Sequence, residues 1–328
     1  MFRHPWHDRK RRQIFPLEKR RRFPRIKRPA KPPLILRKND MTLCIAAIAY
    51  GKTNQSPNIV TISDMMLSDP SWSRDTDSPK VMPVTPNSRW LMMYAGIPTI
   101  AIAVRRAARR ALVGKVERME SVVSAYQAAY EQELRDTIEH QVLARYGMTM
   151  GEFKRKGTDY FGTEYPDVLD NVNKVNIDTD LLLAGFDPTG EPHLVKINED
   201  GREICDKMGF CAIGTGYDLA TASLIHNYKE DLIHTELIYR MAEAKFRSEA
   251  AEGVGTNTAI STLNSAGEWH YVGRGTDGVP GADKIRTLWE KDSNPPVPND
   301  TCVMIFQHLR KVRWVTRTAK KPRKNRRK

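Results

Sequence analysis

The feature that most constrains the fold is a pair of apolar runs joined by a polar turn in the first fifth of the chain. Thr42–Tyr50 is almost wholly apolar, as expected for a strand buried on both faces. Gly51–Asn58 is rich in Gly, Asn, Ser and Pro, the residues typical of turns. Ile59–Ser63 is rich in β-branched residues and predicts a second strand. The pattern therefore predicts a buried hairpin on which the rest of the fold is built.

Both ends of this hairpin carry polar side chains. Thr42 follows Met41 at the head of the first strand, and Asp64 ends the returning strand. A threonine at a chain terminus can hold a nucleophile and a base in one residue, because the reference pKa of an α-amine is about 7.7–8.0. This chemistry requires Thr42 to be the first residue of the mature chain. The alternative is an ordinary strand threonine, which β-propensity alone makes common.

Further short motifs follow in a definite order. They are Pro79-Lys80-Val81, Tyr94-Ala95-Gly96 and Ala212-Ile213-Gly214-Thr215-Gly216. Together with Met41-Thr42 and Asp64, they resemble the proteasome β-subunit group of N-terminal-nucleophile hydrolases, and the similarity covers Thr42–Leu309. The resemblance implies an α+β fold with four layers arranged as an αββα sandwich. It also implies hydrolysis of an amide bond with Thr42 as the nucleophile.

The same resemblance implies roles for individual residues. Asp64 would orient Lys80, whose ammonium favours the neutral α-amine and helps the Thr42 hydroxyl to lose its proton. The backbone N–H of Gly96 would be the oxyanion donor, and the Thr215 hydroxyl would support the nucleophile. The alternatives are solvated loop charges for Asp64 and Lys80, and a glycine at the start of a helix for Gly96.

One region departs from the pattern of these relatives. They carry an aspartate and a serine just before a Gly-rich turn, whereas this chain reads Ser248-Glu249-Ala250-Ala251-Glu252-Gly253. Glu249 is the expected replacement for the aspartate, and no serine aligns with the second position. A catalytically silent subunit of a proteasome-like ring is therefore a second hypothesis.

The period of the apolar residues predicts the other elements. Helices are expected at 97–112, 119–146, 218–229 and 235–251. Strands are expected at 80–84, 89–94, 181–186, 193–197, 210–213, 256–263, 268–272 and 301–307. Polar turns are expected at 67–79 and 199–201, and a short helical insertion at 148–180. Strands and helices in separate runs indicate an α+β fold.

Basic residues are concentrated at the two ends of the chain. Of the net charge of +14, residues 1–40 carry +12 and residues 310–328 carry +11, which leaves −9 for the part between them. The Arg- and Pro-rich first segment cannot bury enough apolar surface to order itself. Three hypotheses account for this segment: a propeptide, a nucleic-acid-binding arm, or a start codon assigned too early. Met41, directly before the first predicted strand, favours the last of them. We therefore expect a folded domain at 41–309 between a basic N-terminal extension and a basic C-terminal tail.

The basic ends also support a third hypothesis, non-specific contact with nucleic acid through the tails. Otherwise the expected partners are a peptide or small amide substrate and further copies of the chain in a homo-oligomer. No apolar stretch is long enough to span a bilayer, and the first forty residues lack the apolar segment of a secretion signal. A cytoplasmic protein without a membrane partner is expected.

No cofactor and no metal are expected. The four cysteines, at 44, 205, 211 and 302, lack the spacing of a metal site or a disulfide framework. The run Gly273-Arg274-Gly275-Thr276-Asp277-Gly278 has the glycine spacing of a dinucleotide-binding loop, but Pro280 and Gly281 follow it instead of a helix. A loop is the better interpretation of that run.

Overall fold

The structure is a computed structural model that describes residues 42–51, 56–69, 72–75, 80–85, 87–272 and 281–291. All of them belong to one of the two units into which the chain divides, residues 38–328. The basic segments 1–40 and 310–328, the glycine-rich loop 273–278 and the expected strand 301–307 lie outside the described residues. The domain boundaries at 40 and 309 stay predictions.

The first sheet contains the predicted hairpin. It has five antiparallel strands in the order β10-β1-β2-β11-β12. These are β10 (Phe210–Ile213), β1 (Cys44–Ala49), β2 (Asn58–Asp64), β11 (Thr258–Asn264) and β12 (Trp269–Tyr271). Cys44 on β1 lies opposite Ser63 on one side and Ile213 on the other. Every residue of β1 is buried, as the apolar run predicts.

The second sheet also has five antiparallel strands, in the order β5-β6-β7-β8-β9. These are β5 (Val81–Pro83), β6 (Trp90–Gly96), β7 (Thr179–Phe186), β8 (Pro192–Asn198) and β9 (Gly201–Ile204). Lys80 immediately precedes β5, and Gly96 is the last residue of β6, where it lies opposite Thr179. Both residues expected at the site therefore lie at strand ends.

Side-chain alternation along β1 explains how the two sheets pack. Ile45 and Ala47 belong to an apolar cluster with helices α5 (Tyr217–Asn227), α6 (His234–Ser248) and α7 (Ala282–Lys291). Cys44, Ala46 and Ile48 point the other way, into a cluster shared with the second sheet that includes Leu91 and Leu182. β1 thus has an apolar core on each face, which explains why all of its residues are apolar.

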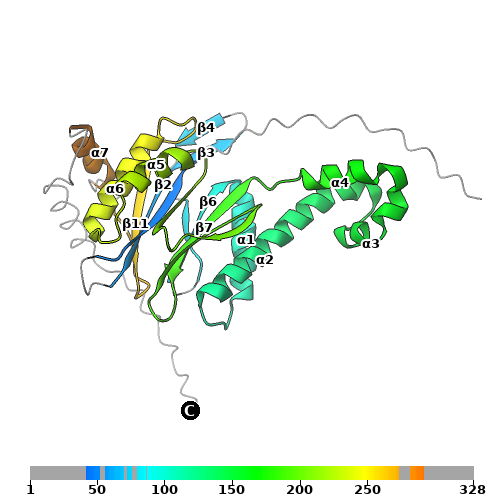
Figure 1. Ribbon diagram of the computed structural model, residues 1–328, viewed down its shortest axis with the longest axis horizontal. Coiled ribbons are helices and arrows are strands. Elements are labelled where there is room, and N and C mark those ends of the chain that lie inside the picture. The colour runs from blue at the N-terminus through cyan, green and yellow to red at the C-terminus, as the bar shows by residue number, and fades with distance from the viewer. Residues whose placement is uncertain are drawn as a thin grey trace, which may run out of the picture. The chain divides into compact units, whose positions relative to one another are not determined.

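The second sheet carries its own helices. An apolar cluster containing Met92, Leu183, Val104 and Tyr126 joins it to α1 (Pro98–Ala111) and α2 (Met119–Ile138). Figure 1 shows α5 and α6 beside β2 and β11, and α1 and α2 beyond β6 and β7 on the opposite side. The expected α+β class, with two antiparallel sheets and helices, is confirmed. None of the helices in the described ranges has the length and apolar character needed to cross a membrane.

The helical insertion predicted at 148–180 is also present. After α2, a π-helical turn, η1 (Glu139–Leu143), and a 3-10 turn, η2 (Ala144–Tyr146), end at Gly147 in the left-handed conformation. The insertion then consists of α3 (Met150–Phe161), a 3-10 turn, η3 (Gly162–Glu164), and α4 (Tyr165–Asn173). Thr149 caps α3 in a reciprocal pair with Glu152. The insertion packs around its own apolar cluster, which includes Phe153 and Val168.

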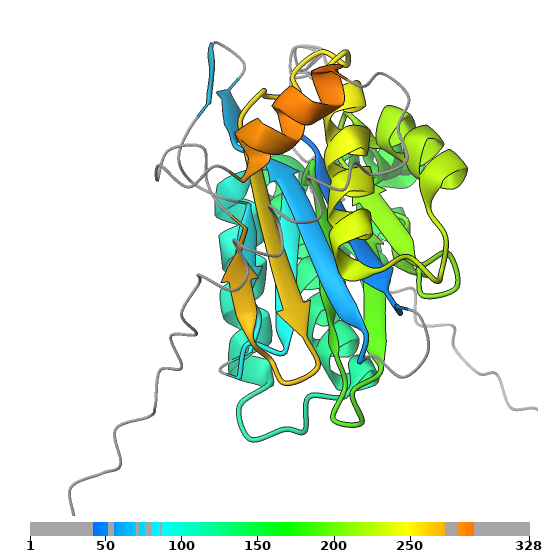
Figure 2. The same cartoon turned by 90° about the vertical axis from the view of Figure 1, so that its left-hand side faces the viewer.

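Four elements differ from the prediction. Strands β3 (Met66–Asp69) and β4 (Trp72–Asp75) pair with each other where polar turns were expected. β9 follows the predicted turn at 199–201, and three of its four residues are exposed, so its sequence lacks an apolar pattern. α7 lies where no element was predicted; Figure 2 shows it, in orange, across one end of β11 and close to α6. In each case pairing or packing, rather than local composition, defines the element.

Candidate active site

The register of the hairpin brings Thr42 and Asp64 together. Leu43 and Asp64 lie side by side, with the Asp64 N–H donating to the Leu43 carbonyl over 3.0 Å. The Asp64 carboxylate oxygen Oδ1 then accepts from the Leu43 N–H over 3.2 Å and from the Thr42 hydroxyl over 3.0 Å. A threonine at the head of one strand and an aspartate at the end of its partner therefore meet because antiparallel pairing places those ends together.

Lys80 completes a buried ionic group. Its Nζ donates to the same Asp64 oxygen over 2.8 Å, and the relative exposures are 3 % for Lys80, 0 % for Asp64 and 2 % for Thr42. The second Asp64 oxygen, Oδ2, accepts from the backbone N–H of Gly255 over 3.1 Å. A buried ion pair is tolerated only when its remaining hydrogen-bonding groups are satisfied. Four donors to one carboxylate meet that requirement and hold it in a single orientation.

The glycine turn after β10 packs against the backbone of Thr42. Gly214 has φ +91°, and a Cβ at that position would lie 2.4 Å from the Thr42 carbonyl oxygen. The Gly216 N–H donates to the same oxygen over 3.4 Å. Thr215 lies between these two glycines, so the turn expected to support the nucleophile is beside it. Only glycine at position 214 permits so close an approach.

The end of β6 lies next to the start of β1. The Cys44 thiol donates to the Tyr94 carbonyl over 3.3 Å. Burial raises the pKa of that thiol to about 12, an effect that the Lys80 charge opposes and the Asp64 charge reinforces. The thiol is therefore protonated at neutral pH and is a poor nucleophile. Two residues beyond Tyr94, Gly96 has φ +109°, and a Cβ there would lie 2.0 Å from the Asp178 carbonyl oxygen.

Glu249 has other partners. Its carboxylate accepts from the Lys245 ammonium and from the Arg286 guanidinium of α7. The neighbouring Ser248 hydroxyl donates to the Ala244 carbonyl within its own helix over 2.8 Å. The structure therefore places Glu249 in a second ionic cluster, which is linked to Asp64 through the loop at Gly255.

Two site residues were not identified from the sequence. Gly255 supplies a donor to Asp64, and Lys245 donates to the Gly255 carbonyl over 2.7 Å. A lysine within an otherwise apolar face of a helix was a signal that could have marked Lys245. Nothing in the local sequence indicates the contact of Gly255, because its partner lies 191 residues away.

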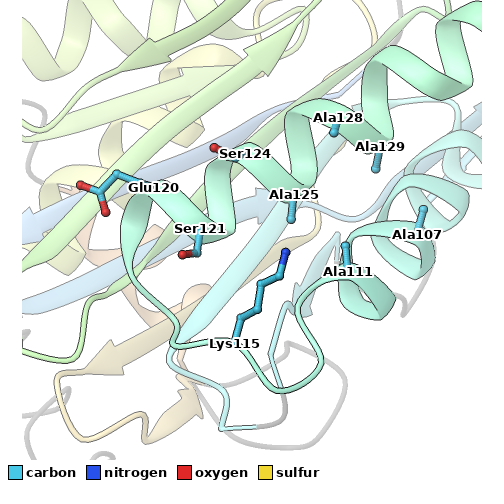
Figure 3. A pocket seen from close by; sticks show the side chains of 9 residues that line it. All are labelled: Ala107, Ala111, Lys115, Glu120, Ser121, Ser124, Ala125, Ala128 and Ala129. Carbon is cyan, nitrogen blue, oxygen red and sulfur yellow. The ribbon is translucent and has the colours of Figure 1, made fainter.

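A pocket of about 620 Å³ lies elsewhere, between α1 and α2. Figure 3 shows its lining of alanines from both helices, with the Lys115 side chain extended across it and Glu120 at its edge. None of the candidate catalytic residues lines it. Within the described ranges, no three or more His, Cys, Asp or Glu side chains are grouped as metal ligands would be.

Comparisons with known proteins agree with this fold. Residues 173–260 match the model of the proteasome subunit family. No match was found among curated proteins. Among solved structures, the chain is similar to the Anbu (Gly-1) mutant from Hyphomicrobium sp. strain MC1, with a TM-score of 0.50 and 13 % identity over 76 % of this chain and 94 % of that one. The fold is therefore proteasome-like.

The matched range has a consequence for the site. It includes the Gly214–Gly216 turn and the Lys245–Gly255 region, but it begins after the hairpin and does not contain Thr42, Asp64 or Lys80. The arrangement of Thr42, Asp64 and Lys80 is therefore an observation independent of the family match.

Proposed function

We propose that this chain is a threonine-type N-terminal-nucleophile amidohydrolase or peptidase resembling a proteasome β subunit. The observation that carries the proposal is the buried contact of the Thr42 hydroxyl with an Asp64 carboxylate that also binds the Lys80 ammonium. The arrangement of two facing sheets, with α5, α6 and α7 on one side and α1 and α2 on the other, is, on this proposal, the four-layer αββα sandwich of those hydrolases. A peptide or a small amide would be the substrate.

The reaction needs a free α-amine on Thr42, and therefore cleavage of the bond between Met41 and Thr42. That amine accepts the hydroxyl proton while Thr42 Oγ1 attacks the carbonyl carbon of the amide. The C–N bond breaks, the leaving amine takes the proton, and the acyl group remains on Oγ1 as an ester. Water, deprotonated by the same amine, then hydrolyses the ester and restores Thr42.

The neighbouring residues would act on charge. The Lys80 ammonium disfavours protonation of the nearby amine and stabilises developing negative charge on Oγ1. Asp64 fixes the position of that ammonium and of the Leu43 backbone. The Gly96 N–H is the proposed oxyanion donor, and the positive φ of Gly96 sets the direction of the chain at that point. The Thr215 hydroxyl is the proposed support for the nucleophile.

The catalytically silent ring subunit is the second candidate, and one observation favours it. The carboxylate expected to replace the relatives' aspartate, Glu249, is engaged by Lys245 and Arg286. Under either candidate we propose a homo-oligomer, because proteasome-like subunits assemble into rings. We also propose that the protein is cytoplasmic. Contact with nucleic acid through the basic tails stays a prediction, because those tails lie outside the described residues.

Mass spectrometry and covalent labelling test the proposal together. The purified protein should contain chains that begin at Thr42, and a β-lactone electrophile should acylate that residue once per chain. Thr42→Ala should abolish labelling with little change in melting temperature, whereas Thr42→Ser should keep measurable labelling. Cys44→Ala is the matched control for a neighbouring nucleophile and should label like the unaltered chain. Chains that begin at Thr42 but take no label would favour the silent subunit.

A further inference from the structure

The loop after α6 is held from two sides. On one side, the Gly255 N–H donates to Asp64 Oδ2 over 3.1 Å. On the other, the carbonyls of Gly255 and Thr256 accept from the Lys245 ammonium over 2.7 and 2.9 Å. One peptide segment therefore connects the carboxylate beneath Thr42 with a second buried cation.

Lys245 is fully buried and its hydrogen bonding is complete. The relative exposure of the residue is 0 %, and its three acceptors are Gly255, Thr256 and the Glu249 carboxylate. An ammonium has three N–H donors, so each has an acceptor. Burial lowers the pKa of Lys245, and the neighbouring Glu249 carboxylate opposes that change. A buried cation with this geometry orients both carbonyls rigidly.

Arg286 closes the cluster from α7. It donates to both oxygens of Glu249 and, over 3.0 Å, to the Thr256 carbonyl. Its guanidinium also lies 4.1 Å from the centre of the Phe246 ring. The Thr256 carbonyl is thus bound by two cations, and Glu249 neutralises part of their charge.

We propose that Lys245, held by Glu249 and Arg286, is a positioning residue for Asp64. By fixing the Gly255 and Thr256 carbonyls, it aims the Gly255 N–H at Asp64 Oδ2 and leaves Oδ1 for Thr42, Leu43 and Lys80. This inference rests on the proposed function only for its catalytic consequence. It gives Glu249 a role different from direct support of the nucleophile. It also supplies, by a salt bridge and a backbone amide, support for the site where the relatives' serine is missing.

The same helix offers matched controls. Glu243, two residues before Lys245, is 2 % exposed and binds Arg240 and Arg247. Both of these ion pairs join residues of α6 itself. Replacing Glu243 or Arg247 therefore removes a comparable ion pair from the same helix without altering the carbonyl contacts.

The test combines hydrogen exchange with Thr42 labelling in the full chain. Lys245→Met should raise the exchange rate of the Gly255 amide about tenfold, as expected when a hydrogen bond of ordinary strength is lost. It should slow β-lactone labelling of Thr42 by a similar factor, and Glu249→Gln should do both to a lesser degree. Arg247→Met and Glu243→Gln should change neither by more than about twofold.

Each outcome decides a separate point. If Lys245→Met does not fold, Glu249→Gln carries the test, because it keeps the side-chain volume and removes only the charge. Unchanged Gly255 exchange in both variants would overturn the proposal. Faster exchange with unchanged labelling would also overturn it, because Lys245 would then be structural only. If the variants exchange faster at Gly255 but the unaltered protein takes no label, the positioning of Gly255 is supported and the proposed hydrolase function is contradicted.

Discussion

The two sheets have the same number of strands but bury different kinds of side chain. On the strands of the second sheet, among described residues, the buried polar side chain is Thr179. The first sheet buries hydroxyls and a carboxylate along β2 and β11: Thr61, Ser63, Asp64, Thr258, Ser261 and Thr262. Buried polar groups cost stability unless they are hydrogen-bonded. The first sheet therefore gives up stability that an apolar sheet would keep, and the candidate active site lies at its end.

Local contacts offset part of that cost. The Thr61 and Ser261 hydroxyls lie 2.6 Å apart across the β2–β11 pair. Asp64 has four donors, as described above. The Ser63 hydroxyl, in contrast, is buried and has no hydrogen-bond partner in the described part of the chain. Buried polar side chains are thus concentrated on β2 and β11, whereas the second sheet contributes Lys80, just before β5, to the ionic group and otherwise packs with apolar side chains. The following variants compare the ionic group with that apolar packing.

The largest effect is expected for Lys80→Met. It leaves the buried Asp64 carboxylate without its cation, which should destabilise the fold by about 3–5 kcal/mol. It should also slow labelling of Thr42 at least about a hundredfold, since the ammonium no longer acts on the amine and hydroxyl. Denaturant unfolding and labelling rates measure the two effects. Labelling at the unaltered rate would contradict the assignment of Lys80.

Leu182→Ala is the counterpart in the apolar layer between the two sheets. Leu182 is fully buried between the sheets, so its truncation should destabilise the protein by about 2–5 kcal/mol. Because the substitution removes apolar volume and no charge or hydrogen-bonding group, the Thr42 labelling rate should stay within about threefold under conditions where the variant is folded. A loss of labelling as large as that of Lys80→Met would remove the distinction between the ionic group and the apolar packing.

Two serines of the first sheet provide a finer test. Ser261→Ala leaves the buried Thr61 hydroxyl without its partner and should cost about 1–3 kcal/mol. Ser63→Ala removes a buried hydroxyl that makes no hydrogen bond to any described residue, so it should be neutral or slightly stabilising. Urea midpoints of the two variants give the answer directly. Equal destabilisation by both would show that satisfaction of the hydroxyl is not what matters.

The smallest effect is a pH dependence in the second sheet. On β8, the Nδ1–H of His193 donates to Asp206 Oδ2 over 2.8 Å. Burial lowers the pKa of His193, but the hydrogen bond and charge of Asp206 outweigh it, so the net shift is upward from 6.5. A raised pKa in the folded state means that protonation stabilises the fold. The contribution is complete below pH 6.5 and is lost as the pH rises through the folded-state value.

His193→Gln should therefore lower stability most in mildly acid solution and least in alkaline solution. Unfolding curves for the variant and the unaltered chain at several pH values measure the difference. A difference that grows with rising pH would contradict the upward shift.

The sequence alone determined the hairpin and the meeting of Thr42 with Asp64. Both follow from local signals: two apolar runs, a polar turn, and a strand pairing that returns the chain to its starting point. Helices α1, α2, α5 and α6 were also predicted from local signals, because the apolar face of a helix consists of residues three and four positions apart. The order of strands and helices then predicted the α+β class.

Only the tertiary structure decided what surrounds that hairpin. Gly255 reaches Asp64 across 191 positions, and Arg286 reaches Glu249 across 37. β9 exists because β8 offers an edge to pair with, and α7 because α6 and β11 offer a surface to pack on. Glu249 was expected beside the nucleophile on the basis of its position in the chain. Instead it binds two cations, Lys245 and Arg286. No local pattern reveals that Arg286 lies close to Glu249, since long-range contacts depend on how the sheets and helices pack.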